Sequence, residues 1–241
     1  MKVQYIHDTI VHNTKAAEIL VPKLMVKYNI NSVVDVGCGI GTWLSVFAKY
    51  ELDYLGIDGD YTDRHLLCID EANFKCFDLN NKIVLDKRYD LAVCLEVVEH
   101  LKPESATIIC ESLTSMSDLV VFSAAIPGQR GQNHLNEQYP QYWVKIFESM
   151  GYFLVDDIKL DIWENSEIEW WYRQNLMILK KNPYAEEKKK LFFAIHPELY
   201  KIKVDEYERS AREYQKVISG KISIMRGIKI LAKALLNSLK F

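Results

Sequence analysis

Residues 33–43 read Val-Val-Asp-Val-Gly-Cys-Gly-Ile-Gly-Thr-Trp. Residues 33–36 form a short apolar, β-branched run, which predicts a buried strand. Glycines follow at alternate positions, and residues 42–50 carry a helical pattern. A strand, a glycine-rich turn and a helix that begins at the turn make a nucleotide-binding unit of the Rossmann type. The unit predicts an α/β fold, and its glycines are Gly37, Gly39 and Gly41.

The ligand expected at this turn is not a dinucleotide. The dinucleotide fingerprint is G-x-G-x-x-G, whereas this stretch is G-x-G-x-G with Asp35 just before it. A carboxylate there would repel a pyrophosphate, but it would attract a ligand that carries an ammonium and a sulfonium. S-adenosylmethionine (SAM) is such a ligand, so we predict that Asp35 and the three glycines shape a SAM site. A glycine-rich turn of some other α/β protein is the alternative.

Two stretches resemble motifs of the class I SAM-dependent methyltransferase family. Residues 35–41 are similar to its D-x-G-x-G-x-G motif, and residues 90–101, Asp-Leu-Ala-Val-Cys-Leu-Glu-Val-Val-Glu-His-Leu, are similar to its fourth motif. The resemblance covers roughly residues 8–181. It implies an enzyme with a Rossmann-like, mostly parallel seven-stranded sheet, helices on both faces and an antiparallel seventh strand. The strands are predicted at residues 33–36, 54–57, 74–77, 89–95, 119–124, 153–156 and 174–180.

Further cofactor contacts are expected where these strands end. Asp58 lies 21 residues after Gly37, where Rossmann-like folds place an acid that accepts hydrogen bonds from ribose hydroxyls. The resemblance implies that Asp78 meets the adenine amine, although this residue could instead cap the segment that follows. It also implies that Glu96 lies beside the cofactor and the transferring methyl group. Trp43 and Leu79 complete the predicted cofactor set.

A long polar loop after the predicted fifth strand carries His134, Asn136 and Glu137. Loops at the carboxyl edge of a sheet often carry function. A sugar hydroxyl needs a base to take its proton, which favours His134 as the catalytic base and Glu137 as the group that orients it or binds an acceptor hydroxyl. His100 is a third catalytic candidate, with a structural role as its alternative. Asn136 is predicted to bind the acceptor.

The same loop favours a sugar-like acceptor. Residues 132–140 resemble a loop of methyltransferases from bacterial surface-glycan and natural-product gene clusters. We therefore expect O-methylation of a sugar, nucleotide-sugar or glycan precursor. The polar residues of the loop could instead only hold its own shape. An N-methyltransferase, a lipid- or quinone-head methyltransferase and a non-catalytic SAM-binding scaffold that acts through its tail are the competing functions.

Other residues are predicted to face the acceptor. His12 and Asn13 lie near the start of a predicted helix at residues 8–28, where they could instead only cap it. Trp171 belongs to an aromatic cluster that either walls the acceptor pocket or is ordinary core.

Metal-dependent relatives use clustered acids near strands four to six. Asp156 and Asp157 are adjacent and so point opposite ways on a strand, which predicts no metal.

Length and composition indicate one α/β domain with an appendage. The 241 residues divide into a predicted methyltransferase domain at 1–183 and a helical appendage at 184–241. The net charge of −3 gives no case for binding nucleic acid. Neither a signal peptide nor an apolar run long enough to span a bilayer is recognisable, so we expect a cytoplasmic protein. The five cysteines lack C-x-x-C pairing and several are predicted to be buried free thiols: Cys38, Cys68, Cys76, Cys94 and Cys110.

Residues 221–241 have the pattern of a basic amphipathic helix. Its basic residues on one face are Arg226, Lys229, Lys233 and Lys240. Its apolar residues on the other face are Ile224, Met225, Ile228, Leu231, Ala232, Leu235, Leu236 and Leu239. Such a helix can lie in a membrane interface with its basic residues on anionic lipid. The alternative is that the apolar face packs on the catalytic domain or on a second copy of the chain.

Overall fold

The computed structural model describes residues 13–155, 158–221 and 223–238. The chain divides into two compact units, Met1–Ala194 and Ile195–Phe241. The first unit therefore extends beyond the predicted boundary at residue 183. Residues after that boundary contact it, since the Lys189 amide donates to the Leu154 carbonyl at 2.8 Å and the rings of Tyr139 and Phe193 lie 5.8 Å apart.

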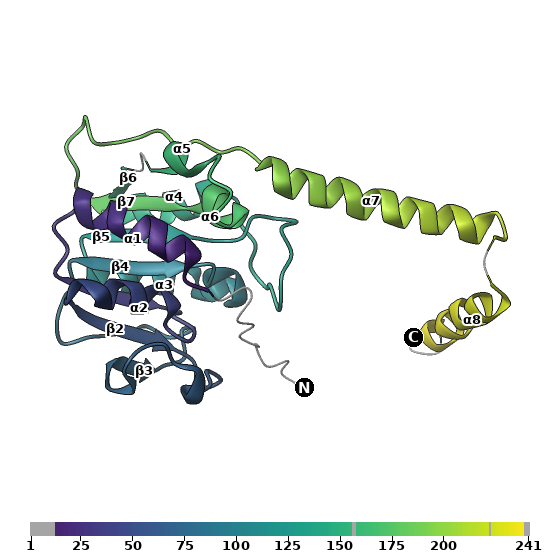
Figure 1. The fold of residues 1–241 in the computed structure, drawn as a ribbon, viewed down its shortest axis with the longest axis horizontal. Coiled ribbons are helices and arrows are strands. Elements are labelled where there is room, and N and C mark those ends of the chain that lie inside the picture. The colour runs from purple at the N-terminus through teal and green to yellow at the C-terminus, as the bar shows by residue number, and fades with distance from the viewer. Residues whose placement is uncertain (1–12, 156–157, 222, 239–241) are drawn as a thin grey trace. The chain divides into compact units, whose positions relative to one another are not determined.

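The first unit is built on one seven-stranded sheet, and the strands are β1 Ser32–Val36, β2 Asp53–Asp58, β3 Phe74–Cys76, β4 Leu91–Leu95, β5 Leu119–Ser123, β6 Tyr152–Leu154 and β7 Met177–Lys181. Their spatial order is β3-β2-β1-β4-β5-β7-β6 (Figure 1). The first five strands pair in parallel, whereas β7 runs antiparallel to both β5 and β6. This confirms the predicted Rossmann-like sheet with its antiparallel seventh strand.

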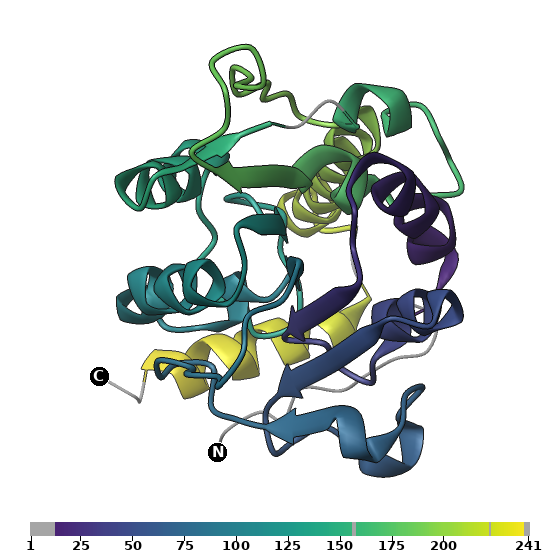
Figure 2. The same ribbon diagram turned by 90° about the vertical axis from the view of Figure 1, so that its left-hand side faces the viewer.

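Helices cover both faces of this sheet, and those of the first unit are α1 Lys15–Lys27, α2 Thr42–Phe47, α3 Ala106–Met116, α4 Pro140–Ser149, α5 Lys159–Ile162 and α6 Trp170–Asn175. Figure 2 shows α1 and α2 on one side and α3 and α4 on the other. Each side has its own apolar core, with Leu20 and Phe47 in one and Ile109 and Phe147 in the other. Strands buried on both faces are mostly apolar, which explains the valines of β1 and β5 and makes the buried Asp35 of β1 an exception.

The structure corrects one predicted strand. Residues 174–180 were expected to be strand seven, but Gln174 and Asn175 are the last residues of α6, and β7 begins at Met177. Both amide side chains are buried, and the Gln174 side chain donates to that of Asn175 at 3.0 Å. The apolar run that predicts a strand begins only after these two polar residues. The prediction for residues 153–156 ends on Asp156, which, like Asp157, lies outside the described residues.

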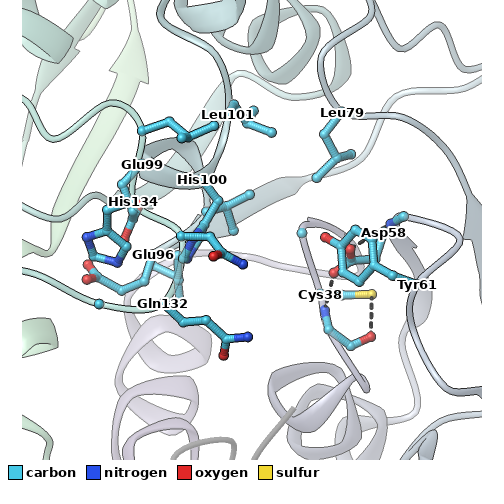
Figure 3. Close-up of a pocket in the computed structure, with 18 of the residues that line it drawn as sticks. Cys38, Asp58, Tyr61, Leu79, Glu96, Glu99, His100, Leu101, Gln132 and His134 are labelled. Carbon is cyan, nitrogen blue, oxygen red and sulfur yellow. Dashed lines mark hydrogen bonds between the residues drawn. The ribbon is translucent and has the colours of Figure 1, made fainter. Parts of the chain in front are cut away.

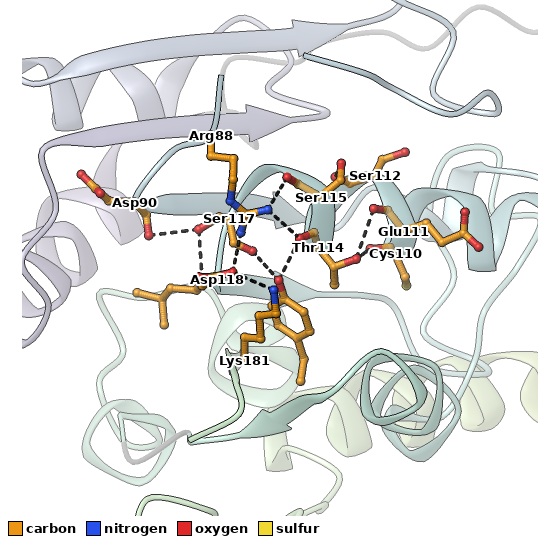
Figure 4. A network of polar contacts seen from close by, with 12 residues as sticks. Arg88, Asp90, Cys110, Glu111, Ser112, Thr114, Ser115, Ser117, Asp118 and Lys181 are labelled. Atoms are coloured by element: carbon orange, nitrogen blue, oxygen red, sulfur yellow. Dashed lines mark hydrogen bonds and ion pairs between the residues drawn. The ribbon is translucent and has the colours of Figure 1, made fainter. Parts of the chain in front are cut away.

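A polar network lies at the edge of the sheet where the parallel strands begin (Figure 4). The Arg88 guanidinium donates to the Ser115 carbonyl at 2.5 Å and pairs with Asp118, which precedes β5. Lys181, at the end of β7, lies 3.5 Å from Asp118, and the Tyr152 hydroxyl donates to the carbonyl that ends α3. This end of the sheet is occupied by structural contacts, which leaves the carboxyl ends of the strands for a ligand.

The second unit consists of α7 Pro197–Ile218 and α8 Ile224–Ser238. Arg226 of α8 forms an ion pair with Glu213 of α7. No helix in the described part of the chain is long and apolar enough to cross a membrane. All five cysteines are free; Cys68 and Cys76 are exposed, and the other three are buried, as expected for structural thiols.

Candidate active site

A cavity of about 1600 Å³ opens at the carboxyl ends of the parallel strands. Figure 3 shows that its lining gathers in two groups. Cys38, which follows β1, and Asp58, which ends β2, lie at one end. Glu99, His100 and His134 lie together at the other end. Pockets for single small ligands usually enclose roughly 300–1000 Å³, so this cavity has room for a cofactor and a second molecule.

The glycine-rich turn after β1 shapes the first end of the cavity. Gly37 has a φ of +81°, and a Cβ atom there would lie 2.3 Å from a methyl group of Val97. Glycine is therefore required for the turn to pass so close to the end of β4. The amides of Gly39 and Gly59 both donate to the buried Asp58 carboxylate, each at 2.6 Å. These bonds join the turn after β1 to the end of β2.

Asp35 is the charged residue of β1, and it lines the same cavity. Burial, and then the nearby Asp58 carboxylate, raise its pKa to about 8. The side chain is therefore mostly neutral at pH 7 when the cavity is empty. A cationic ligand would favour its ionised form.

Glu96 lines the cavity and has an unusual backbone conformation, with a φ of +53°. Its amide bonds to the carbonyl and the hydroxyl of Ser123, both at 3.1 Å. Its carboxylate accepts hydrogen bonds from Gln129 at 2.9 Å and from Asn175 at 3.1 Å. Burial raises the pKa of Glu96 even though these bonds favour the ionised form. Strained residues of this kind cluster at functional sites.

The second end of the cavity is assembled by backbone bonds between two distant segments. The Glu99 carbonyl, in the turn η4 Val98–His100, accepts from the amides of Leu135 at 2.7 Å and Asn136 at 3.0 Å. These bonds bring the loop after β5 against the turn after β4. The imidazole rings of His100 and His134 consequently lie edge to face, with centroids 4.9 Å apart.

Glu137 holds His134 from behind. Its carboxylate lies 2.8 Å from the His134 Nδ1 atom and accepts from the amides of Gly128 and Arg130, both at 2.7 Å. Although burial opposes it, these contacts lower the pKa of Glu137. An ionised carboxylate here favours the tautomer with a proton on Nδ1, which leaves Nε2 as the nitrogen available for chemistry.

The comparisons with known proteins agree with this geometry. A family model described as "Methyltransferase domain" matches residues 14–175. The chain belongs to the class I SAM-dependent methyltransferase family. The protein is thus an enzyme that uses SAM as its cofactor.

Solved structures share the fold of this methyltransferase at low sequence identity. A SAM-dependent methyltransferase from Clostridium acetobutylicum is 11% identical, with a TM-score of 0.52 over 70% of this chain and 92% of that one. Magnesium protoporphyrin IX methyltransferase from Synechocystis, solved with bound SAM, is 19% identical, with a TM-score of 0.51 over 72% and 82%. The CcbJ methyltransferase from Streptomyces caelestis is 12% identical, with a TM-score of 0.54 over 70% and 90%. A search of curated proteins gave no match.

Most of the predicted cofactor residues of the methyltransferase line the cavity. They are Asp35, Gly37, Gly39, Trp43, Asp58, Asp78, Leu79 and Glu96. Gly41 does not line it, because this residue begins α2 and packs against Ile69 instead. Asp78 lines the cavity and also accepts hydrogen bonds from the Asn80 amide and side chain, at 3.0 and 2.9 Å. These bonds support the capping alternative, and the contact of Asp78 with the adenine amine stays a prediction.

Of the residues predicted to bind the acceptor, the structure places some in the cavity lining and others elsewhere. Trp171 lines the cavity beside Tyr172, and so does Asn13, whose side chain donates to Glu169 at 2.9 Å. Asn136 is only 3% exposed, does not line the cavity and accepts a hydrogen bond from Gln138. Its place is structural, so we no longer propose it as an acceptor ligand. His12 lies outside the described residues.

Sequence reasoning missed the side chains that hold Glu96. Gln129 and Asn175 bond to Glu96 and also to each other, at 2.9 Å. Asn175 is buried beside an apolar strand, and a buried amide needs a partner. Its position next to an apolar run was a usable signal, but no sequence pattern identifies which carboxylate it contacts.

Proposed function

We propose that this methyltransferase transfers the methyl group of SAM to a hydroxyl group of a sugar, nucleotide-sugar or glycan precursor, with His134 as the general base. One observation carries the proposal: an imidazole backed by a carboxylate at 2.8 Å lines the same cavity as the glycine-rich turn. In this proposal the residues near Asp35 and Asp58 bind SAM, and the acceptor enters between Trp171 and His134.

The chemistry of the transfer explains why a base is needed. The sulfonium of SAM is a good leaving group, so the enzyme mainly aligns the acceptor oxygen, the methyl carbon and the sulfur. A hydroxyl attacks well only as its proton is removed. His134 would take that proton on Nε2, while Glu137 stabilises the imidazolium that forms. An amine acceptor would need less help, because a neutral amine is already nucleophilic.

The lining of the acceptor end supports a polyhydroxylated molecule. Trp170 and Trp171 line the cavity and provide aromatic surface against which the apolar C–H side of a sugar ring can pack. Amide side chains from the loop after β5, among them Gln132 and Asn133, line the same cavity and can bond to hydroxyls.

The test is methyl transfer from SAM with a panel of acceptors, measured as S-adenosylhomocysteine released. We expect turnover with nucleotide sugars or glycan precursors and little with amines. Turnover confined to amines, or to lipid and quinone heads, would replace the proposal with one of those alternatives. SAM binding without turnover on any acceptor would favour the scaffold function.

A pH dependence of SAM affinity follows from Asp35. We propose that its carboxylate meets the SAM ammonium, so the neutral acid, with a pKa of about 8 in the empty cavity, must lose its proton on binding. Affinity should then rise roughly tenfold per pH unit from pH 6 towards pH 8. The rise should level off near pH 8, where Asp35 is ionised even in the empty cavity. Affinity should fall at higher pH, because the amino group of SAM loses its proton near pH 8. Titration calorimetry in buffers of different ionisation enthalpy should show release of close to one proton per SAM at pH 7.

The two thiols near Asp35 do not share this titration. The Cys38 and Cys94 thiols stay neutral, because burial raises their pKa well above the usual value. Asp58 is bound by two backbone amides. The Asp35→Asn variant should therefore bind SAM more weakly at pH 8 and lose most of the pH dependence. An unchanged slope in this variant would remove Asp35 from the proposed ammonium site.

We further propose that α8 contacts an anionic membrane surface, with self-association as the alternative. Ile224, Met225, Ile228 and Leu231 are exposed, as are the basic residues of the described helix. We expect the full chain to co-sediment with vesicles that contain phosphatidylglycerol and less with vesicles of phosphatidylcholine alone. A chain lacking residues 219–241 should remain in the supernatant.

A charge-reversed control refines this test. The Lys229→Glu/Lys233→Glu variant keeps the apolar residues but should lose binding to anionic vesicles. Equal sedimentation of full-length and truncated chains would contradict the membrane proposal. A changed oligomeric state on truncation, seen by light scattering, would instead support packing of α8 against a second copy.

A further inference from the structure

We propose that Glu99, His100 and His134 form a binding site for a divalent transition-metal cation at the acceptor end of the cavity. The site itself follows from the side chains. Its role in methyl transfer rests on the proposed function, because it requires that the acceptor hydroxyl reaches this end of the cavity. The sequence predicted no metal, but that prediction considered only the acids at residues 156–157.

The three side chains converge on one point. A carboxylate oxygen of Glu99 and one imidazole nitrogen each from His100 and His134 all lie within 4.8 Å of one another. Two ligands of one cation at about 2.1 Å can be up to about 4.2 Å apart, so small side-chain rotations would complete the coordination. Figure 3 shows Glu99 and both imidazoles on the same side of the cavity.

Glu99 gives the strongest reason for a cation at this point. Its side chain is 1% exposed, and its Oε2 atom has no hydrogen-bond partner within the part of the chain that the structure describes. The carboxylate of Glu96 is also close enough to interact with it electrostatically. A buried carboxylate oxygen that lacks a donor is costly, and a bound cation would satisfy it and offset the repulsion between the two acids.

The surroundings of His134 fit a metal ligand. A metal-bound histidine usually donates its other ring N–H to a carboxylate, and Glu137 lies 2.8 Å from Nδ1. Room for the ring depends on Gly131, where an added Cβ atom would lie 2.1 Å from the His134 Nε2 atom. The backbone of Leu135 and Asn136, bonded to the Glu99 carbonyl, keeps the loop in place.

The donor set indicates the class of cation. Two imidazoles and one carboxylate suit first-row divalent metals such as Mn²⁺, Fe²⁺, Co²⁺ and Zn²⁺, whereas Ca²⁺ and Mg²⁺ prefer oxygen ligands throughout. Three protein ligands leave coordination positions open. Neighbouring hydroxyl oxygens of a polyhydroxylated acceptor could fill two of them, which would orient one oxygen towards the SAM methyl group.

The cation would also change how the proton is lost. A hydroxyl bound to a divalent cation has a lowered pKa, so its proton can pass to water. An electron pair of the oxygen then forms the C–O bond, the C–S bond breaks, and its electron pair stays on the sulfur of S-adenosylhomocysteine. With the cation bound, His134 acts as a ligand, and this replaces its role as the base.

The test uses Co²⁺ as a spectroscopic probe on the full chain after treatment with EDTA. We expect one Co²⁺ per chain, with visible ligand-field absorption and a measurable heat of binding. Glu99→Gln and His134→Ala should each weaken Co²⁺ binding by roughly 100-fold, and Glu137→Gln by roughly tenfold. The exposed His65 provides a control, because His65→Ala removes a surface imidazole and should leave the affinity unchanged.

Two further measurements separate the cation from the proposed acceptor. Absence of Co²⁺ binding, or equal binding by Glu99→Gln and the unchanged chain, would overturn the cation site. If EDTA then left sugar methylation intact, His134 as a base would stand without the cation. Co²⁺ binding with the expected variant pattern but no methylation of any hydroxyl acceptor would retain the cation site and reject the proposed acceptor. We expect EDTA to abolish turnover and Mn²⁺ or Co²⁺ to restore it.

Discussion

Replacing His134 with alanine is expected to lower turnover by about two to four orders of magnitude, which is the usual contribution of a general base. The His134 imidazole either takes the proton of the acceptor hydroxyl or binds the cation that lowers the pKa of that hydroxyl. SAM affinity should change little, because His134 lies at the opposite end of the cavity from Asp58 (Figure 3). The measurement is single-turnover formation of S-adenosylhomocysteine, together with calorimetric titration of SAM.

Matched variants show whether the loss is specific. Glu137→Gln keeps the size of the side chain that supports His134 but removes its charge, so turnover should fall by an intermediate factor. His65→Ala, an exposed histidine elsewhere in the chain, should behave as the unchanged enzyme. Near-normal turnover of His134→Ala would reject His134 as base and as ligand. It would then direct attention to His100 or to an acceptor that needs no base.

Replacing Gly39 with valine is expected to weaken SAM binding by at least about 100-fold. Gly39 lines the cavity with a φ of +56°, and its amide bonds to Asp58. A β-branched residue in this backbone region costs roughly 1–3 kcal/mol of conformational strain, so the turn should relax away from the shape that binds the ligand. The side chain would also occupy space that the ligand needs. Calorimetry measures the affinity, and circular dichroism with thermal unfolding checks that the fold is retained.

The control for this variant separates ligand loss from backbone strain. Gly220 also has a positive φ, +67°, has open space around it and lies in the other compact unit. Gly220→Val should therefore show comparable local strain with unchanged SAM affinity. Undiminished SAM binding by Gly39→Val would contradict the assignment of the glycine-rich turn to the cofactor.

The cofactor end of the cavity was largely predictable because its determinants are local in sequence. A buried strand, a turn that needs glycine and a helix follow one another within residues 33–50. Asp58 comes at the end of the next strand, and parallel pairing of β1 with β2 brings it to the same edge. Each step depends on the period of the apolar residues or on backbone sterics, and both are visible in one short stretch.

The same local logic failed where a side chain's role depends on its neighbours in space. Gly41 follows the glycine pattern but packs against Ile69, and Asn136 belongs to the polar loop but is buried and does not line the cavity. Glu96 is bonded to Gln129 and Asn175, which come from a loop and a helix far along the chain. A polar residue in a loop has no periodic pattern that would indicate the side of the backbone on which it points.

The sequence by itself determined the Rossmann-like sheet and the edge at which the predicted cofactor residues lie, because strand period, turn sterics and strand order place them there. Tertiary structure decided the chemistry at the other end. Glu99 and His134 are far apart in the sequence and meet because the Glu99 carbonyl bonds the amides that follow His134. Backbone bonds between distant segments follow from packing of the whole sheet, so the convergence of a carboxylate and two imidazoles could be seen only in the folded chain.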